Sequence, residues 1–179
     1  NDLYNFEFVL FFSRDGGYYS EKNENPRNSN FINLDKSIEF LINKKIKVIR
    51  IGRNPKSKYQ NNSKYFFDYS SLFENRYDDI AELMMFKECK FIVSQNSGLN
   101  FYQWFFDKKI LLYDWFPIGI RPPFNNCIYI PKKYKKDNSY IKYSDIPNHL
   151  LIAEEEAIFK ENNIQIEESS SEEILEFIK

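Results

Sequence analysis

The residues best suited to chemistry lie in polar loops that follow short apolar segments. The first such loop, residues 13–17 (SRDGG), follows an apolar run at residues 6–12. A guanidinium at the end of a buried strand has a rigid support, and the planar fork of Arg14 can bind two oxygens of one phosphate. Gly16 and the glycine after it let the backbone approach a ligand closely. The alternative is a hairpin-like turn in which Arg14 and Asp15 form a solvated pair.

A second candidate is the turn at residues 95–98 (QNSG), which leads from an apolar segment into a predicted helix. Backbone N–H groups at a helix start, the positive end of the helix dipole and nearby hydroxyl groups together form an anion site. The alternative is that a side chain of the turn only caps the helix. The turn matches neither the GxxxxGK(S/T) loop nor the GxGxxG loop. The residues expected to contact phosphate are Asn96, Ser97, Gly98 and Leu99.

The segment at residues 46–51 and the loop after it contain Arg50, Gly52 and Arg53. We expect Arg50 and Gly52 to contact the nucleotide or its phosphates. The alternative is one surface arginine and one arginine that is paired with a carboxylate.

Several carboxylates and one lysine complete the set. Asp15, Asp68, Asp78 and Asp114 lie near predicted strand ends or helix starts, where a carboxylate could act as a base or orient a sugar hydroxyl. Asp78 is more typical of a helix-start residue. Lys132 could contact a phosphate, or it could be solvated.

The order of elements predicts the fold that positions these loops. Short apolar segments alternate with segments of helical period, which favours a parallel sheet covered on both faces. We therefore predict an α/β fold, a Rossmann-like three-layer sandwich with a mostly parallel sheet. In such folds ligands bind at the carboxyl ends of the strands, near the point where the strand order reverses. The predicted strands are residues 6–12, 46–51, 65–68, 91–94, 109–113 and 127–130, and the predicted helices before residue 144 begin near residues 34, 78 and 99.

The last part of the chain is predicted to be helical. We expect residues 1–179 to form a single nucleotide-sugar-binding domain with a helical extension at about residues 144–179. Ser170 and Glu173 have the spacing of a capping box, which predicts a final helix at residues 172–178. In the helix that begins near residue 78, Ile80, Leu83 and Met84 are expected on one face.

Composition excludes several classes of function. The formal charge of −1, from 25 basic and 26 acidic residues, provides no global field for nucleic acid. A single histidine, His149, rules out the familiar metal sites built on several histidines, so no metal is expected. Cys89 and Cys127 are expected to be reduced thiols. No apolar run approaches the ~20 residues of a membrane span. The chain begins without methionine, and we interpret it as part of a longer protein.

Six short motifs, in order along the chain, resemble a group of bacterial glycosyltransferases. These enzymes are distantly similar to fucosyltransferases and have the two-domain GT-B architecture. The resemblance implies transfer of a sugar from a nucleotide-diphosphate donor to an acceptor sugar or glycan, without a cofactor or metal. It also implies that this chain is the carboxy-terminal, nucleotide-binding half, and that an amino-terminal domain lies outside it. The matching segments are residues 14–18, 27–28, 48–52, 68–69, 91–99 and 130–132.

The resemblance also implies roles for individual residues. Arg14 and the helix start at Ser97 would stabilise the leaving diphosphate, and Asp15 would act as acceptor base or orient the arginine. Tyr18, Asp68 and Lys132 would contact substrate. Related arginine loops often have a histidine where this chain has Phe12, which argues against catalysis assisted by histidine. A cytoplasmic location is implied, at the inner face of the membrane if the setting is polysaccharide assembly.

Two other interpretations of the sequence stay open. One is a different α/β enzyme that acts on phosphorylated small molecules. The other is a binding domain without catalytic activity, whose strand-end loops hold no substrate.

Overall fold

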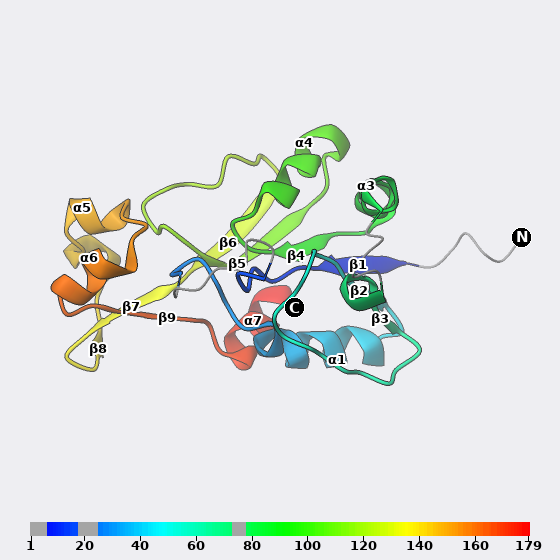
Figure 1. Ribbon diagram of the computed structural model, residues 1–179, viewed down its shortest axis with the longest axis horizontal. Helices are drawn as coiled ribbons and strands as arrows, with labels where there is room; N and C mark the ends of the chain where they lie inside the picture. Colours follow the sequence, from blue (N-terminus) through cyan, green and yellow to red (C-terminus); the bar gives the residue numbers. More distant parts are fainter. Residues whose placement is uncertain (1–6, 18–24, 73–77) are drawn as a thin grey trace, which may run out of the picture.

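A six-stranded parallel sheet forms the centre of the molecule in the computed structural model, which describes residues 7–17, 25–72 and 78–179. The strand order is β3-β2-β1-β4-β5-β6, and every pair of neighbours is parallel. Helices cover both faces, so the predicted Rossmann-like three-layer fold is confirmed (Figure 1). The strands are β1 (Phe8–Phe11), β2 (Lys47–Arg50), β3 (Phe66–Asp68), β4 (Ile92–Ser94), β5 (Ile110–Trp115) and β6 (Cys127–Pro131).

The strand order reverses on either side of β1. After β1 the chain continues outward to β2 and β3, and it then returns to place β4 on the other side of β1. Val9 pairs with Val48 of β2, and Leu10 pairs with Ile92 of β4. The loops that leave β1 and β4 therefore separate above the sheet edge, which is where such folds bind ligands.

One face of the sheet is covered by α1 (Asp35–Asn43), which follows the 3-10 turn η1 (Phe31–Leu34), and by the last helix, α7 (Ser171–Ile178). Leu34, Ile38 and Ile174 are fully buried against the sheet residues Val9 and Phe11. The predicted capping box starts α7, because the Ser170 hydroxyl accepts from the Glu173 N–H and the Glu173 side chain accepts from the Ser170 N–H. The helix begins at Ser171, one residue before the predicted start, and ends at Ile178 as predicted.

The opposite face is covered by α3 (Asp79–Glu88) and by α4 (Tyr102–Phe106), which continues from the 3-10 turn η2 (Gly98–Phe101); the short α2 (Tyr69–Leu72) follows β3. Asp78 caps α3 by accepting from the Ile80 and Ala81 N–H groups. The prediction that Ile80, Leu83 and Met84 form the apolar face of α3 was wrong. Ile80 is 72% exposed and Met84 is 47% exposed, while Phe86 is buried.

A second, antiparallel sheet was not predicted. It has the order β8-β7-β9 and contains β7 (Lys133–Lys136), β8 (Ser139–Tyr140) and β9 (Gln165–Glu167). The helical prediction for residues 144–179 is therefore wrong at β9, although short helices precede it. Phe116, Tyr134 and Phe159 form a separate aromatic core under this sheet. The short helices are η3 (Tyr143–Asp145), α5 (Asn148–Leu151) and α6 (Glu156–Glu161).

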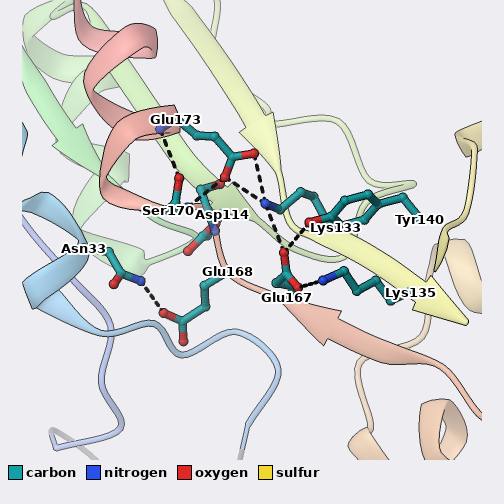
Figure 2. Close-up of polar contacts among 10 residues, drawn as sticks. Asn33, Asp114, Lys133, Lys135, Tyr140, Glu167, Glu168, Ser170 and Glu173 are labelled. Atoms are coloured by element: carbon teal, nitrogen blue, oxygen red, sulfur yellow. Dashed lines mark hydrogen bonds and ion pairs between the residues drawn. The ribbon is translucent and has the colours of Figure 1, made fainter. Parts of the chain in front are cut away.

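An ion-pair cluster joins the small sheet to α7 (Figure 2). Lys133 of β7 contacts Glu167 of β9 at 3.2 Å and Glu173 of α7 at 2.7 Å. Glu167 also pairs with Lys135 and accepts a hydrogen bond from the Tyr140 hydroxyl at 2.6 Å. These hydrogen bonds, from Lys135 and then Tyr140, lower the pKa of Glu167 from 4.5 to about 2. The carboxylate therefore links the three strands of the small sheet, and Lys133 extends the cluster to the helix.

We predict that Glu167→Gln destabilises the fold at pH 7 by about 0.5–1 kcal/mol, the range for partly exposed ion pairs. Because the folded pKa is lowered, the stabilisation is full above the ordinary pKa of 4.5 and fades as the pH falls toward about 2. Urea unfolding of both proteins from pH 7 to pH 3 measures the difference. Glu161→Gln, on an exposed part of α6, is the control. A difference that is zero at pH 7, or unchanged at pH 3, would contradict the assignment.

Candidate functional site

A cavity of about 470 Å³ lies at the carboxyl ends of β1 and β4. It occupies the point where the strand order reverses, the position at which the sequence predicted a site. The loop after β1 forms one side, and the turn after β4 with the start of α3 forms the other. The lining residues are Phe12, Ser13, Arg14, Asp15, Gly16, Gly17, Arg53, Asp79, Glu82, Ser97, Gly98, Leu99 and Tyr102.

The backbone of Arg14 is fixed from two sides. Its N–H donates to Oε1 of the buried Gln95 at 2.7 Å, and its carbonyl oxygen accepts from the Ser29 N–H at 2.8 Å. The Ser13 hydroxyl also donates a hydrogen bond to the Ser29 carbonyl oxygen at 2.8 Å. Arg14 therefore enters the cavity from an anchored backbone, which suits preorganised binding of an anion.

The carboxylate of Asp15 holds a neighbouring loop. Its Oδ1 accepts from the Gly17 N–H at 3.0 Å. Its Oδ2 accepts from the Ser57 N–H at 3.0 Å and from the Ser57 hydroxyl at 3.2 Å. The two bonds to Ser57 hold the loop at residues 53–57 against the cavity, and the bond to Gly17 fixes the loop after β1, so the geometry makes Asp15 a positioning residue.

Gly17 is required where these two loops meet. A Cβ atom at Gly17 would lie 1.9 Å from the Asn54 carbonyl oxygen and 2.8 Å from the Lys56 nitrogen. Gly16 has a φ of 73°, in the region that favours glycine. Gly98 is different, because a Cβ there would have no atom within 4 Å. The backbone at Gly98 therefore borders open space in the cavity.

The predicted helix after β4, residues 99–106, is present, but its first part, η2, is a 3-10 turn and not an α-helix. Ser97 caps η2, since its hydroxyl accepts from the Leu99 N–H at 3.3 Å. Only four residues of 3-10 turn and five of α-helix follow, so the helix dipole is small. The Asn96 side chain turns away and donates to the Phe116 carbonyl oxygen at 2.8 Å. An anion at this turn would therefore rely on Arg14 and on the Gly98 backbone more than on the helix dipole.

Arg50 and Asp68, both predicted to contact substrate, lie outside the cavity lining, so the structure does not bring them together with Arg14. Arg50 is 2% exposed, and its guanidinium lies over the Phe31 ring at 4.1 Å. It donates to the Ser57 carbonyl oxygen at 2.8 Å and to Asp68 at 3.4 Å. Burial lowers the pKa of Arg50, and the nearby Asp68 opposes this effect. Arg50 and Asp68 together support the loop at residues 53–57. Arg50 is thus the arginine paired with a carboxylate, which was the alternative that the sequence left open.

Other predicted residues are placed elsewhere. Gly52, with a φ of 117°, packs on the Phe12 ring and does not line the cavity. Lys132 is buried next to a different cavity, and Tyr18 lies outside the described residues. The sequence did not predict that Gln95 and Ser29 fix the Arg14 backbone, because both contacts join residues that are distant along the chain.

The cavity is electrostatically mixed. Arg14 and Arg53 supply positive charge, while Asp15, Asp79 and Glu82 supply negative charge. Arg53 forms an ion pair with Asp79 at the rim. Glu82, on α3, is 2% exposed, which is unusually buried for a glutamate. This lining can accept an anionic group at the Arg14 end and hydrogen-bond to hydroxyl groups at the α3 end.

Within the described ranges, no group of three or more His, Cys, Asp or Glu residues could hold a metal ion. In the same ranges no helix has the length and apolar character needed to cross a membrane. In the comparisons with known proteins, no family model, curated protein or solved structure matches the chain.

Gly17→Ala is expected to displace the loop at residues 53–57 and to destabilise the fold by about 1–3 kcal/mol, the usual cost of overpacking. Gly98→Ala is the matched control, because its new methyl group meets open space. Urea unfolding of the two variants measures the difference. Equal stability of both variants would contradict the close approach at Gly17.

Proposed function

We propose that the chain is the nucleotide-binding domain of a glycosyltransferase and that the cavity after β1 and β4 holds a nucleotide-diphosphate sugar. The observation that carries the proposal is the anchored Arg14 beside the open backbone at Gly98, at the reversal point of a parallel sheet. Doubly wound folds bind nucleotides at this point. The cavity volume of about 470 Å³ also lies within the range of small-molecule sites.

The mixed charge of the lining favours this ligand over a simple phosphate. A nucleotide-diphosphate sugar has a charged diphosphate and neutral, hydroxyl-rich ends. Arg14 suits the diphosphate, while the carboxylates of Asp79 and Glu82 suit hydroxyl groups. Inorganic phosphate could use only the Arg14 end of the cavity, because it has no neutral, hydroxyl-rich part for the α3 end.

In sugar transfer, an acceptor hydroxyl attacks the anomeric carbon, and the bond from that carbon to the diphosphate oxygen breaks. Negative charge builds on the leaving diphosphate. Arg14 and the N–H groups near Gly98 would stabilise this charge, and one such preorganised donor can contribute about 3–4 kcal/mol. Asp15 would act through the loop at residues 53–57, because both of its oxygens already accept hydrogen bonds from Gly17 and Ser57.

The finer parts of the proposal rest on the resemblance of the six motifs. They are the GT-B architecture, an amino-terminal domain on the acceptor side, a glycan acceptor, a route without metal, and a cytoplasmic setting. The alternative is an enzyme that acts on other phosphorylated small molecules. In that alternative, the phosphate of the substrate would also bind at the Arg14 end of the cavity, but no nucleoside would be needed.

We predict that one of UDP, GDP, CDP or ADP raises the melting temperature of the protein and that Arg14→Ala weakens this binding about 10- to 100-fold. A hydrogen bond to a charged group is worth about 1.5–3 kcal/mol, and binding to the native state raises its stability by mass action. Thermal melting against each diphosphate and inorganic phosphate measures both effects. Arg121→Ala, at an exposed arginine outside the cavity lining, is the control.

Equal binding of phosphate and of every diphosphate would favour the alternative. A diphosphate shift that Arg14→Ala leaves unchanged would contradict the proposed site.

A further inference from the structure

A second cavity, of about 580 Å³, lies between the segment that begins at residue 25 and the small sheet. It is separate from the first cavity and shares no lining residue with it. Lys132 and Glu168 line it together with the amides Asn28 and Gln165 and the apolar side chains Ile164 and Ile166.

Lys132 is the unusual member of this lining. It is 3% exposed, and burial lowers its pKa. Its ammonium group donates to the Asn28 carbonyl oxygen at 2.5 Å. An ammonium group has three N–H donors, and the described residues give this one a single acceptor. A buried donor without an acceptor is costly, so a ligand with acceptor oxygens would be stabilised here.

Two carboxylates already balance the charge of Lys132. Asp114 and Glu168 both lie close enough to raise the pKa of the ammonium group against the effect of burial. Asp114 is 1% exposed and accepts from the Ser29 hydroxyl at 2.8 Å and from the Ser169 N–H at 2.7 Å. These fixed negative charges lie beside the cavity, so an additional anion would gain little from Lys132.

Glu168 offers an acceptor at the same cavity. Its Oε2 accepts from the Asn33 side chain at 2.6 Å (Figure 2). The same oxygen accepts from the Asn30 N–H at 3.0 Å. No residue in the described ranges donates to its Oε1, which can therefore accept from a hydroxyl group. At the rim of the cavity, Lys160 forms an ion pair with Glu156, so these two charges balance each other. Lys56 also lines the cavity, so the lining and the adjacent Asp114 together hold three positive charges (Lys56, Lys132, Lys160) and three negative charges (Asp114, Glu156, Glu168). Donor and acceptor groups are thus combined without excess charge.

We propose that this second cavity binds a neutral saccharide ring. The hydroxyl groups of a sugar can accept from Lys132 and donate to Glu168, and the amides of Asn28 and Gln165 can do both. The apolar C–H face of the ring suits Ile164 and Ile166. The inference rests on this cavity and stands without the nucleotide site.

One further step rests on the proposed function. The loop at residues 53–57 places Arg53 in the first cavity and Lys56 in the second. The saccharide would then belong to the acceptor glycan, which this chain would hold together with the amino-terminal domain, on the far side of this loop from the donor.

The test is a titration of the ¹⁵N-labelled protein with the methyl glycosides of glucose, galactose, mannose and N-acetylglucosamine, followed by amide chemical shifts. We expect at least one glycoside to shift the amides of Asn28, Gln165 and Glu168. Glucuronate and inorganic phosphate are the anionic comparisons, and the amides of Gly16 and Gly98 report on the first cavity.

Lys132→Met should weaken glycoside binding at least 10-fold, and Lys136→Met, at an exposed lysine of β7, should leave it unchanged. Gln165→Trp tests the same cavity if the buried substitution prevents folding, because Gln165 is exposed on β9 and can be enlarged without entering the core. This variant should also weaken binding at least 10-fold.

Three results would overturn the inference: no shift with any glycoside, shifts only near Gly16 and Gly98, or shifts near Lys132 with the anions alone. Failure of every nucleoside diphosphate to bind, with the glycoside shifts intact, would instead remove the proposed transferase function and the acceptor assignment. The experiments therefore distinguish failure of the saccharide site from failure of the proposed transferase function.

Discussion

Strand β1 lies between β2 and β4, and these two pairings position the candidate site. Because the chain winds outward from β1 in one direction and returns on its other side, the loops after β1 and β4 cannot cover each other. They leave a cavity at the sheet edge. The central strands β1 and β4 are covered on both faces, as parallel sheets require. The position of the cavity is thus a consequence of topology.

The residues around the cavity are held by contacts that reach far along the chain. Gln95 and Ser29 fix Arg14, while Asp15 and Arg50 both bind the loop through residue 57. The same loop therefore depends on carboxylate, guanidinium and glycine contacts at once. Such a site is organised before any ligand arrives, which is the condition for strong electrostatic stabilisation of a developing charge.

The sequence predicted the parts that local patterns determine. The apolar runs at β1, β4 and β5 and the capping box of α7 are continuous signals, and they placed Arg14 and Ser97 at neighbouring strand ends. The strand β9 gave no such signal, because its three residues depend on pairing with β7. The buried face of α3 was misjudged because Ile80 is exposed while Glu82 is buried.

Site residues were harder to separate from supporting residues. Arg14 and Arg50 both follow the pattern of an arginine at a strand end, and only the fold shows that Arg50 packs on Phe31. The burial of Lys132 beside Asp114 likewise depends on segments that are distant in sequence. The presence of an arginine near a strand end therefore predicted a region of the fold, but not which arginine lines the cavity.

The proposed function depends on a diphosphate binding in the cavity beside Arg14. The most direct measurement is a crystal structure of the chain with the nucleoside diphosphate that it binds most tightly. We predict phosphate oxygens within hydrogen-bonding distance of the Arg14 guanidinium and of backbone N–H groups near Gly98. Phosphates bound elsewhere, with the Arg14 cavity empty, would contradict the proposal.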